Sequence, residues 1–532
     1  MTTRQQIERR RTFAIISHPD AGKTTLTEKL LLYGGAINLA GSVKGKKTAR
    51  HAVSDWMEIE KQRGISVTSS VLQFEYNGFC VNILDTPGHQ DFSEDTYRTL
   101  MAADSAVMVI DAAKGVEAQT KKLFKVCVMR NIPIFTFVNK MDREAKSPLD
   151  LLQDIEDVLG IDTYPMNWPV GSGKEFKGVY DRGRKEILAF EPVQSGVKQV
   201  RTIEAKLGDA NLDALIGESF HQTLADDVDL LEGAGTEFDL QAVLKGRLTP
   251  VFFGSALTNF GVEPFLEEFL RLTPTPLPRN SQTGVVDPFS PNFSAFVFKI
   301  QANMNKAHRD RIAFLRICSG KFEKGMEVYH VQQGKEIKIS QPQQMMAEER
   351  EIVDEAYAGD ILGVFDPGIF SIGDTLVAGK DTFAFEGIPT FAPEHFAQLR
   401  QTDTMKRKQF VKGISQIAQE GAIQIFKDIG GGMEEVIVGA VGTLQFDVLE
   451  YRLKNEYGVD IRLQNLPYQH IRWIEKSEKE VKDLDLTSDS RRIEDLKGKK
   501  LLLFTSFWNV AWAEEHNQGL VLSEFGRAEE LK

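Results

Sequence analysis

Five short and almost entirely apolar runs recur in the first half of the chain, at residues 13–17, 81–85, 105–111, 132–139 and 250–254. Runs of this length that are apolar on both faces are typical of parallel strands covered by helices on each side. Charged segments with helical periodicity lie between them, for example residues 117–130. The first part of the chain is therefore predicted to be an α/β fold with a doubly wound, mostly parallel sheet.

Two proline-bearing segments divide the rest of the chain. Residues 273–279 (TPTPLPR) and 387–393 (GIPTFAP) read as linkers. We therefore predict three domains, at residues 1–277, 285–385 and 389–532. The second reads as short strands separated by glycine turns, which predicts a small β-barrel. The third alternates helical and strand-like segments, which predicts an α+β domain.

Two segments fit this division less simply. Residues 143–249 interrupt the first domain with glycine-punctuated strand candidates and a polar, acidic helical part, so an insert is predicted there. The segment after Leu466 is polar and gives no clear structural pattern. Within it, the aromatic run SFWNVAW at residues 506–512 is predicted to belong to a core.

The composition is that of an ordinary globular chain. Hydrophobic residues make up 42% and charged residues 26% of the 532 residues, and no apolar stretch approaches the roughly 18 residues of a membrane span. The N-terminal residues lack the apolar segment of a secretory signal. Cys80, Cys127 and Cys318 are too far apart for a zinc cluster, which favours reduced thiols and a cytoplasmic protein. The net charge of −12 argues against a nucleic-acid coat protein, and we expect a monomer with neither DNA nor membrane as a partner.

The first apolar run leads directly into a phosphate-binding motif. It consists of Ser17, His18, Pro19, Asp20, Ala21, Gly22, Lys23, Thr24 and Thr25. The motif fits GxxxxGK[ST], except that a serine stands in the place of the first glycine. Backbone N–H groups of such a loop and of the following helix point at phosphate oxygens. Lys23 supplies a charge for the β and γ oxygens and Thr24 a hydroxyl for Mg²⁺, whereas His18 fits a packing or hydrogen-bonding role better.

A second motif ends the run at residues 81–85. It consists of Asp85, Thr86, Pro87, Gly88 and His89. A carboxylate at the end of a strand can hold Mg²⁺ through water, and the glycine leaves an N–H free for a γ-phosphate. DTPG alone is a common turn sequence. Because it follows a phosphate loop, it predicts a γ-phosphate sensor, with His89 as the candidate catalytic residue.

Two further motifs predict that the bound base is guanine. They are Asn139, Lys140 and Asp142 after the run at 132–139, and Ser255, Ala256 and Leu257 after the run at 250–254. The Asp142 carboxylate can accept hydrogen bonds from N1–H and the exocyclic amine of guanine, donors that adenine does not offer there. Asn139 would brace the loop, Lys140 would lie along the base, and the Ala256 N–H would meet O6. Four motifs in order, each at the end of a strand, predict a GTP site.

Residues 55–66 complete the set of motifs. They read DWMEIEKQRGIS, and together with SHPDAGKTT and DTPGH they resemble the translational GTPases, most closely the branch that acts in termination. The resemblance covers about residues 8–470. It implies that Ser66 is a Mg²⁺ ligand alongside Thr24 and Asp85, and that His89 orients the attacking water. It also implies that Asp20 helps to hold a monovalent cation near the β–γ bridge.

The same resemblance implies a function and partners. A termination GTPase of this kind binds the 70S ribosome after peptide release. It then promotes dissociation and recycling of the class I, codon-reading release factor, hydrolysing GTP to GDP and phosphate with Mg²⁺ as cofactor. The chain has no GGQ tripeptide, which argues against cleavage of the peptidyl ester. The basic run at residues 44–50 is a candidate contact with ribosomal RNA, although a solvated loop explains it slightly better.

Two alternatives stay open from the sequence. A translocase or ribosome-rescue GTPase of the elongation factor G type shares the motifs, but it has further domains after the α+β domain, and the segment after Leu466 is too short for two of them. A metabolic GTPase, such as the GTPase partner of a sulfate-activating enzyme, shares the motifs and the β-barrel. Stimulation of turnover by ribosomes separates these classes.

Overall fold

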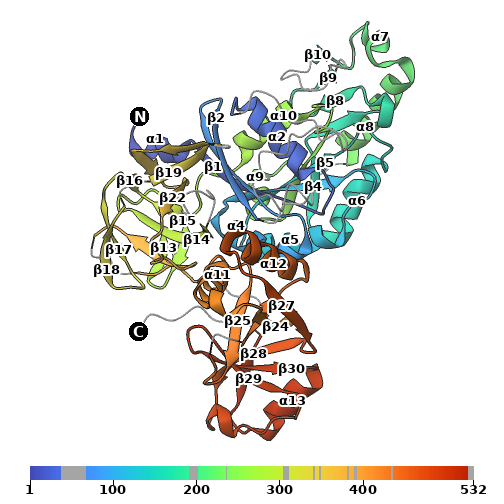
Figure 1. Ribbon diagram of the computed structural model, residues 1–532. Coiled ribbons are helices and arrows are strands. Elements are labelled where there is room, and N and C mark those ends of the chain that lie inside the picture. The colour runs from blue at the N-terminus through green and yellow to red at the C-terminus, as the bar shows by residue number, and fades with distance from the viewer. Residues whose placement is uncertain are drawn as a thin grey trace.

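The computed structural model describes residues 1–36, 68–190, 202–234, 237–302, 311–339, 342–346, 349–379, 383–388, 392–432 and 435–524. Ser66 and the basic run at residues 44–50 lie outside these ranges, so what was predicted for them stays a prediction. Figure 1 shows three parts in chain order: a mixed part coloured blue to green, a β-rich part in yellow tones, and an orange-to-red part. No helix of the described residues is long and apolar enough to cross a membrane.

A seven-stranded sheet forms the centre of the first part. Its strands, in spatial order, are β2 (Ser70–Tyr76), β3 (Phe79–Asp85), β1 (Arg10–Ser17), β4 (Ser105–Asp111), β5 (Ile134–Asn139), β11 (Leu248–Phe253) and β6 (Asp162–Pro165). Every neighbouring pair is parallel except β2 and β3. The predicted, mostly parallel sheet is confirmed. The antiparallel edge strand was not predicted, and its hairpin turn places Asn77 and Gly78 at positive φ, 47° and 83°.

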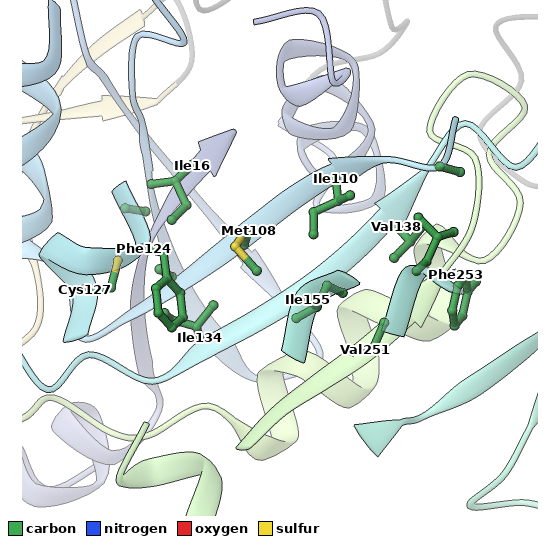
Figure 2. Close-up of a cluster of buried hydrophobic side chains, with 14 of the residues drawn as sticks. Ile16, Met108, Ile110, Phe124, Cys127, Ile134, Val138, Ile155, Val251 and Phe253 are labelled. Atoms are coloured by element: carbon green, nitrogen blue, oxygen red, sulfur yellow. The ribbon is translucent and has the colours of Figure 1, made fainter. Parts of the chain in front are cut away.

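Helices cover both faces of this sheet. One face packs against α2 (Lys23–Tyr33) and α10 (Val262–Leu272), and the other packs against α4 (Ser93–Ala102), α5 (Ala118–Met129) and α6 (Pro148–Leu159). Figure 2 shows the core on this second face of the sheet, which includes Met108 and Ile110 of β4 and Phe124 and Cys127 of α5. Burial raises the pKa of the Cys127 thiol to about 12, so this cysteine stays an unreactive core residue.

The predicted insert at residues 143–249 overlaps the main sheet, because α6 and β6 lie within it. The remaining part forms a second, antiparallel sheet with strands in the order β10 (Thr202–Ala205), β9 (Glu186–Phe190), β8 (Gly178–Asp181) and β7 (Asn167–Val170). Three helices follow it: α7 (Leu212–Ile216), α8 (Glu218–Ala234) and α9 (Leu240–Leu244). The indole of Trp168 donates to Asp227 Oδ2 over 2.9 Å and joins α8 to this sheet.

The second part is antiparallel. A hairpin of β12 (Arg279–Ser281) and β13 (Gly284–Val286) precedes an eight-stranded sheet in the order β18 (Lys335–Lys338), β17 (Glu327–His330), β23 (Thr375–Val377), β14 (Ser294–Ala302), β15 (Arg311–Ser319), β22 (Ile361–Phe365), β19 (Pro342–Met346) and β20 (Glu349–Ile352). A further pair is β16 (Lys321–Glu323) with β21 (Glu355–Tyr357). Apolar residues from both sheets, together with Ile7 of α1 (Thr3–Glu8), share one core. An enclosed core of this kind agrees with the predicted β-barrel.

The third part is the α+β domain. Its eight strands lie in the order β27 (Ile461–Leu466), β24 (His395–Gln401), β26 (Glu435–Ala440), β25 (Gln424–Asp428), β29 (Arg491–Asp495), β30 (Lys500–Phe504), β28 (His470–Lys476) and β31 (Val521–Ser523). Helices α11 (Arg407–Gln419) and α12 (Leu444–Tyr457) pack on the first half of the sheet through a shared core. The polar segment after Leu466 therefore adds four strands to one continuous sheet.

The aromatic run at residues 506–512 begins α13 (Phe507–His516). Its prediction as core is wrong for two residues, because Phe507 and Trp508 are 62% and 65% exposed, while Val510 is buried. The helix packs through a single face, so adjacent residues of the run point in different directions.

Buried charges join the first two parts. Asp104, between α4 and β4, forms an ion pair with Arg316 of β15, and both side chains are 1% exposed. Asp104 also accepts hydrogen bonds from Arg279 at 3.4 Å and from the backbone N–H of Leu277 at 3.1 Å. A second pair joins Arg10 Nε to Asp360 Oδ2 over 2.7 Å.

We expect Asp104→Ala to destabilise this junction strongly, because it leaves two buried guanidinium groups without their carboxylate. Removing one partner of a buried pair costs about 3–5 kcal/mol. The exposed pair of Lys324 and Asp354, at 3.2 Å, offers a matched control, and Asp354→Ala should change stability by less than about 0.5 kcal/mol. Urea denaturation of both variants measures the difference, and equal stabilities would contradict the assigned role of Asp104.

Candidate nucleotide-binding site

The described residues of the four predicted motifs lie at one edge of the main sheet. This follows from the sheet order, since the strands that precede them are parallel and their carboxyl ends share that edge. Ser17 ends β1, residues 18–22 form the loop, and Lys23, Thr24 and Thr25 open α2. Asp85 ends β3 and Asn139 ends β5. Residues 255–257 follow β11.

The phosphate loop ends at Gly22, the residue that caps the N-terminus of α2. Gly22 has φ 98°, and no side chain caps the helix. A Cβ added to Gly22 would overlap the Asn139 amide, so both conformation and space require glycine. The first N–H groups of this eleven-residue helix therefore have no intrahelical acceptor. They form a donor set suited to phosphate oxygens.

Lys23 and Asp85 bring the first two motifs into contact. The two side chains form an ion pair and are 6% and 2% exposed. The Thr27 hydroxyl lies 3.4 Å from Asp85 Oδ1. Thr24, which directly follows Lys23, is half-buried. The residues thus offer a carboxylate and a hydroxyl, which are oxygen donors of the kind Mg²⁺ prefers, next to an ammonium for phosphate. This donor set fits a Mg²⁺-bound nucleotide.

The segment after β3 lies against the phosphate loop. The Thr86 hydroxyl donates to the Ile15 carbonyl over 2.7 Å, and a Cβ added to Gly88 would lie 3.6 Å from Pro19 Cα. His89 follows, with its side chain one-third exposed. The N–H of Asp91 donates to His89 Nδ1 over 3.3 Å, and Asp91 Oδ1 lies 3.1 Å from the same nitrogen. Nδ1 therefore accepts a hydrogen bond from the Asp91 backbone, which leaves Nε2 as the nitrogen that can contact a water.

Asn139 joins the phosphate loop to the last motif. Its Nδ2 donates to the Ala21 carbonyl over 2.9 Å, and its Oδ1 accepts from the Ala256 N–H over 2.9 Å. We expected that N–H to meet O6 of guanine. In the structure it donates to Asn139 Oδ1, because the buried amide needs an acceptor, and its contact with O6 stays a prediction.

Asp142 and Lys140 occupy the base end of the site. The Ser255 hydroxyl donates to Asp142 Oδ1 over 2.6 Å, so the second carboxylate oxygen of the half-buried Asp142 is available to a base. Lys140 donates to the Asp20 carbonyl and, over 2.7 Å, to Asp111 Oδ2. Burial alone would raise the pKa of Asp111, but the bonds from Lys140 and the Ala113 N–H outweigh it and lower that pKa. Leu257, two residues after Ser255, is 37% exposed.

Sequence reasoning missed three residues of this site. They are Thr27, Asp91 and Asp111. Asp111 could have been found, because it also ends a strand of the parallel sheet. Thr27 lies one helical turn after Lys23, which is a weaker signal. Asp91 gave no sequence signal of its own.

The remaining predicted residues receive less support. His18 Nε2 lies 3.3 Å from Glu117 Oε1, which fits the hydrogen-bonding role expected of it. Asp20 is exposed with φ 66°, and its role toward a monovalent cation stays a prediction. The described residues contain no cluster of three or more His, Cys, Asp and Glu side chains that could hold a metal.

Three family profiles match successive parts of the chain. Residues 8–275 match the family described as "Elongation factor Tu GTP binding domain", residues 292–379 match "Elongation factor G domain 2", and residues 385–514 match "Class II release factor RF3, C-terminal domain". The three matches follow the order of the three structural parts.

Similar proteins agree with these profiles. A protein of Symbiobacterium thermophilum named "Peptide chain release factor 3" is 60% identical over 98% of this chain and 99% of its own length. A protein of the same name from Gloeobacter violaceus is 53% identical over 98% of each chain. A solved structure from Thermus thermophilus has a TM-score of 0.68 at 22% identity, covering 89% of this chain and 71% of that one. At that identity it supports the fold alone.

Asp142→Asn should exchange the base preference of this site. The amide oxygen of the new side chain could still accept from Ser255, while its NH₂ group would face the 2-amino group of guanine, donor against donor. Xanthine carries a carbonyl at that carbon, so we expect GTP affinity to fall and XTP affinity to rise, by factors that reach about 10⁴ in sites built on hydrogen bonds. Competitive binding of GTP, XTP and ATP checks this, with the exposed Asp150→Asn on α6 as control. A retained GTP preference would show that Asp142 does not read the base.

Proposed function

The chain belongs to the peptide chain release factor 3 family of translational GTPases, and we propose that it hydrolyses GTP on the 70S ribosome during termination. In this role it promotes dissociation and recycling of class I release factors after peptide release, in the cytoplasm where ribosomes act. The match of residues 385–514 to the class II release factor C-terminal domain carries this proposal, because the GTP-binding part is shared with other translational GTPases.

The geometry supports guanine nucleotide binding at the edge of the main sheet. The uncapped N-terminus of α2 and Lys23 would hold the β- and γ-phosphates, and the available oxygen of Asp142 would hold the base. Lys23 would exchange its partner Asp85 for phosphate oxygens, so that neither buried charge is left unpaired. Thr24 and Asp85, with Ser66, would hold Mg²⁺, which when bound neutralises charge developing on the phosphate oxygens.

His89 would position the water that attacks the γ-phosphorus. Its Nδ1 accepts the backbone N–H of Asp91, which orients the ring and leaves Nε2 to hydrogen-bond that water. The attack breaks the bond between the γ-phosphorus and the β–γ bridging oxygen and yields GDP and phosphate. Gly88, which directly precedes His89 and faces Pro19 of the phosphate loop, would place its N–H near the γ-phosphate.

The translocase alternative is less well supported than termination. The relatives named "Peptide chain release factor 3" are matched over 98–99% of their own length, which favours termination. The motifs of the site are shared with metabolic GTPases, whereas the match of residues 385–514 to a release factor domain favours termination.

The proposed function is tested by measuring GTP turnover with and without 70S ribosomes, followed by release of a class I factor from stop-codon complexes. We expect ribosomes to stimulate turnover and GTP to speed the release. Turnover that ribosomes leave unchanged would overturn the proposal and favour a metabolic GTPase.

His89→Ala should slow hydrolysis while leaving GTP binding nearly intact, because the side chain acts on the water and not on the bound nucleotide. A loss of roughly 10²-fold or more in the ribosome-stimulated rate is expected for a positioned general acid–base group. His395→Ala, which removes an exposed histidine at the start of β24, serves as the control and should retain the full rate. An unchanged rate in His89→Ala would remove His89 from the mechanism.

A further inference from the structure

Asp91 connects the candidate catalytic histidine to the C-terminal domain. It lies in η1 (Gln90–Phe92), directly before α4, and its side chain is 8% exposed. One carboxylate oxygen, Oδ1, lies 3.1 Å from His89 Nδ1. The other, Oδ2, accepts the backbone N–H of Leu444 over 2.8 Å, although the two residues are 353 positions apart in the chain. A single buried carboxylate therefore contacts both the nucleotide site and another domain.

The N-terminus of α12 has no side-chain cap from its own domain and leaves space for the Asp91 carboxylate. Leu444 is the first residue of the helix, and its N-cap residue Thr443 makes no side-chain capping hydrogen bond. Asp91 supplies the missing acceptor from a different domain, at the positive end of the helix dipole. A Cβ added to Gly442 would overlap Asp91 Cγ, so the glycine leaves space that the carboxylate fills.

Arg98 makes a second contact between the first part of the chain and the C-terminal domain, at the end of a different helix. It lies on α4 and donates over 3.1 Å to the Gly421 carbonyl, just beyond the C-terminus of α11. A cation is favourable at that negative end of a helix. The segment after β3 thus meets the positive end of α12 with an anion and the negative end of α11 with a cation. Figure 1 shows α4 lying against α12 and α11 at the junction of the three parts.

We propose that Asp91 is a positioning residue that couples docking of the C-terminal domain on α4 to the orientation of His89. The inference rests on the proposed function, because it assigns the reason for holding His89 in that reaction. With the domain docked, the Leu444 N–H fixes the Asp91 carboxylate and so holds residue 91, whose backbone N–H donates to Nδ1 of the imidazole. When the domain moves away, the carboxylate loses that partner and His89 loses its fixed orientation.

A substitution on the far side of the contact tests this coupling without altering the nucleotide site. Gly442→Ala places a methyl group against Asp91, whereas a Cβ added to Gly432, in the same domain, meets nothing within 4 Å. We expect Gly442→Ala to lower the ribosome-stimulated kcat by about tenfold to a hundredfold, the size expected for misplacing a catalytic group. The GTP affinity and the half-saturating ribosome concentration should stay at wild-type values, and Gly432→Ala should retain the full rate.

Asp91→Asn provides a second variant of unchanged volume. Its amide oxygen can still accept from Leu444, but it removes the charge beside His89 Nδ1. We expect a similar loss of kcat, and a double variant no slower than the slower single one, because both changes act through one contact. A further variant, Asp91→Ala, removes the acceptor of the Leu444 N–H, and the rate of amide hydrogen exchange in residues 442–447 should rise in it. In Gly442→Ala, the exchange rate in residues 88–93 should rise.

Several results would overturn the coupling. They are a wild-type or higher kcat in Gly442→Ala, an equal loss in Gly432→Ala, or a loss confined to ribosome affinity. Failure of the proposed function is distinguishable, because it appears as wild-type turnover that ribosomes do not stimulate. In that case the intrinsic hydrolysis rates of Gly442→Ala and Gly432→Ala, together with the exchange measurements, still decide the role of Asp91.

Discussion

Parallel pairing in the main sheet is the constraint on which the site depends. Because β1 pairs in parallel with β3 and β4, and β5 with β4 and β11, the segments that leave these strands emerge at one edge. Lys23 reaches Asp85 there, and Asn139 bonds both Ala21 and Ala256. These contacts join motifs that are far apart in the chain, so the loops have little freedom to move separately. A preorganised edge of this kind is what binding and positioning a triphosphate require.

The same sheet also supports the other domains through buried polar contacts. Asp104 holds Arg316 and Arg279, and Arg10 holds Asp360, at positions almost inaccessible to water. Buried ion pairs contribute little net stability when well formed, yet breaking one is costly. They therefore specify how the β-rich part sits on the first part more than they stabilise it. Asp104 lies between α4 and β4, and Arg10 lies on β1, so both are close in sequence to elements that carry the site.

The segment from His89 to Arg98 belongs to the nucleotide site and to a domain interface at once. His89 directly follows Gly88, which lies beside Pro19 of the phosphate loop, whereas Asp91 and Arg98 contact the ends of α12 and α11. A domain movement that breaks these contacts must alter the surroundings of His89, since Asp91 touches both. A nucleotide-dependent change near Gly88 would act on the C-terminal domain through the same residues. This arrangement gives a physical basis for linking the nucleotide state to the positions of the domains.

The sequence by itself determined the parallel strands, the order of the motifs and the helix at Leu444–Tyr457, because these depend on local periodicity and on residue types that each motif requires. Only the tertiary structure decided the antiparallel hairpin of β2, the partner of the Ala256 N–H and the exposure of Phe507 and Trp508. It alone also brought Asp91 to Leu444. Such contacts depend on which surfaces pack together across hundreds of residues, and no local pattern encodes that choice. Most residues of the candidate site could therefore be named from the sequence, but Asp91 and the connection it makes between the site and the C-terminal domain could not.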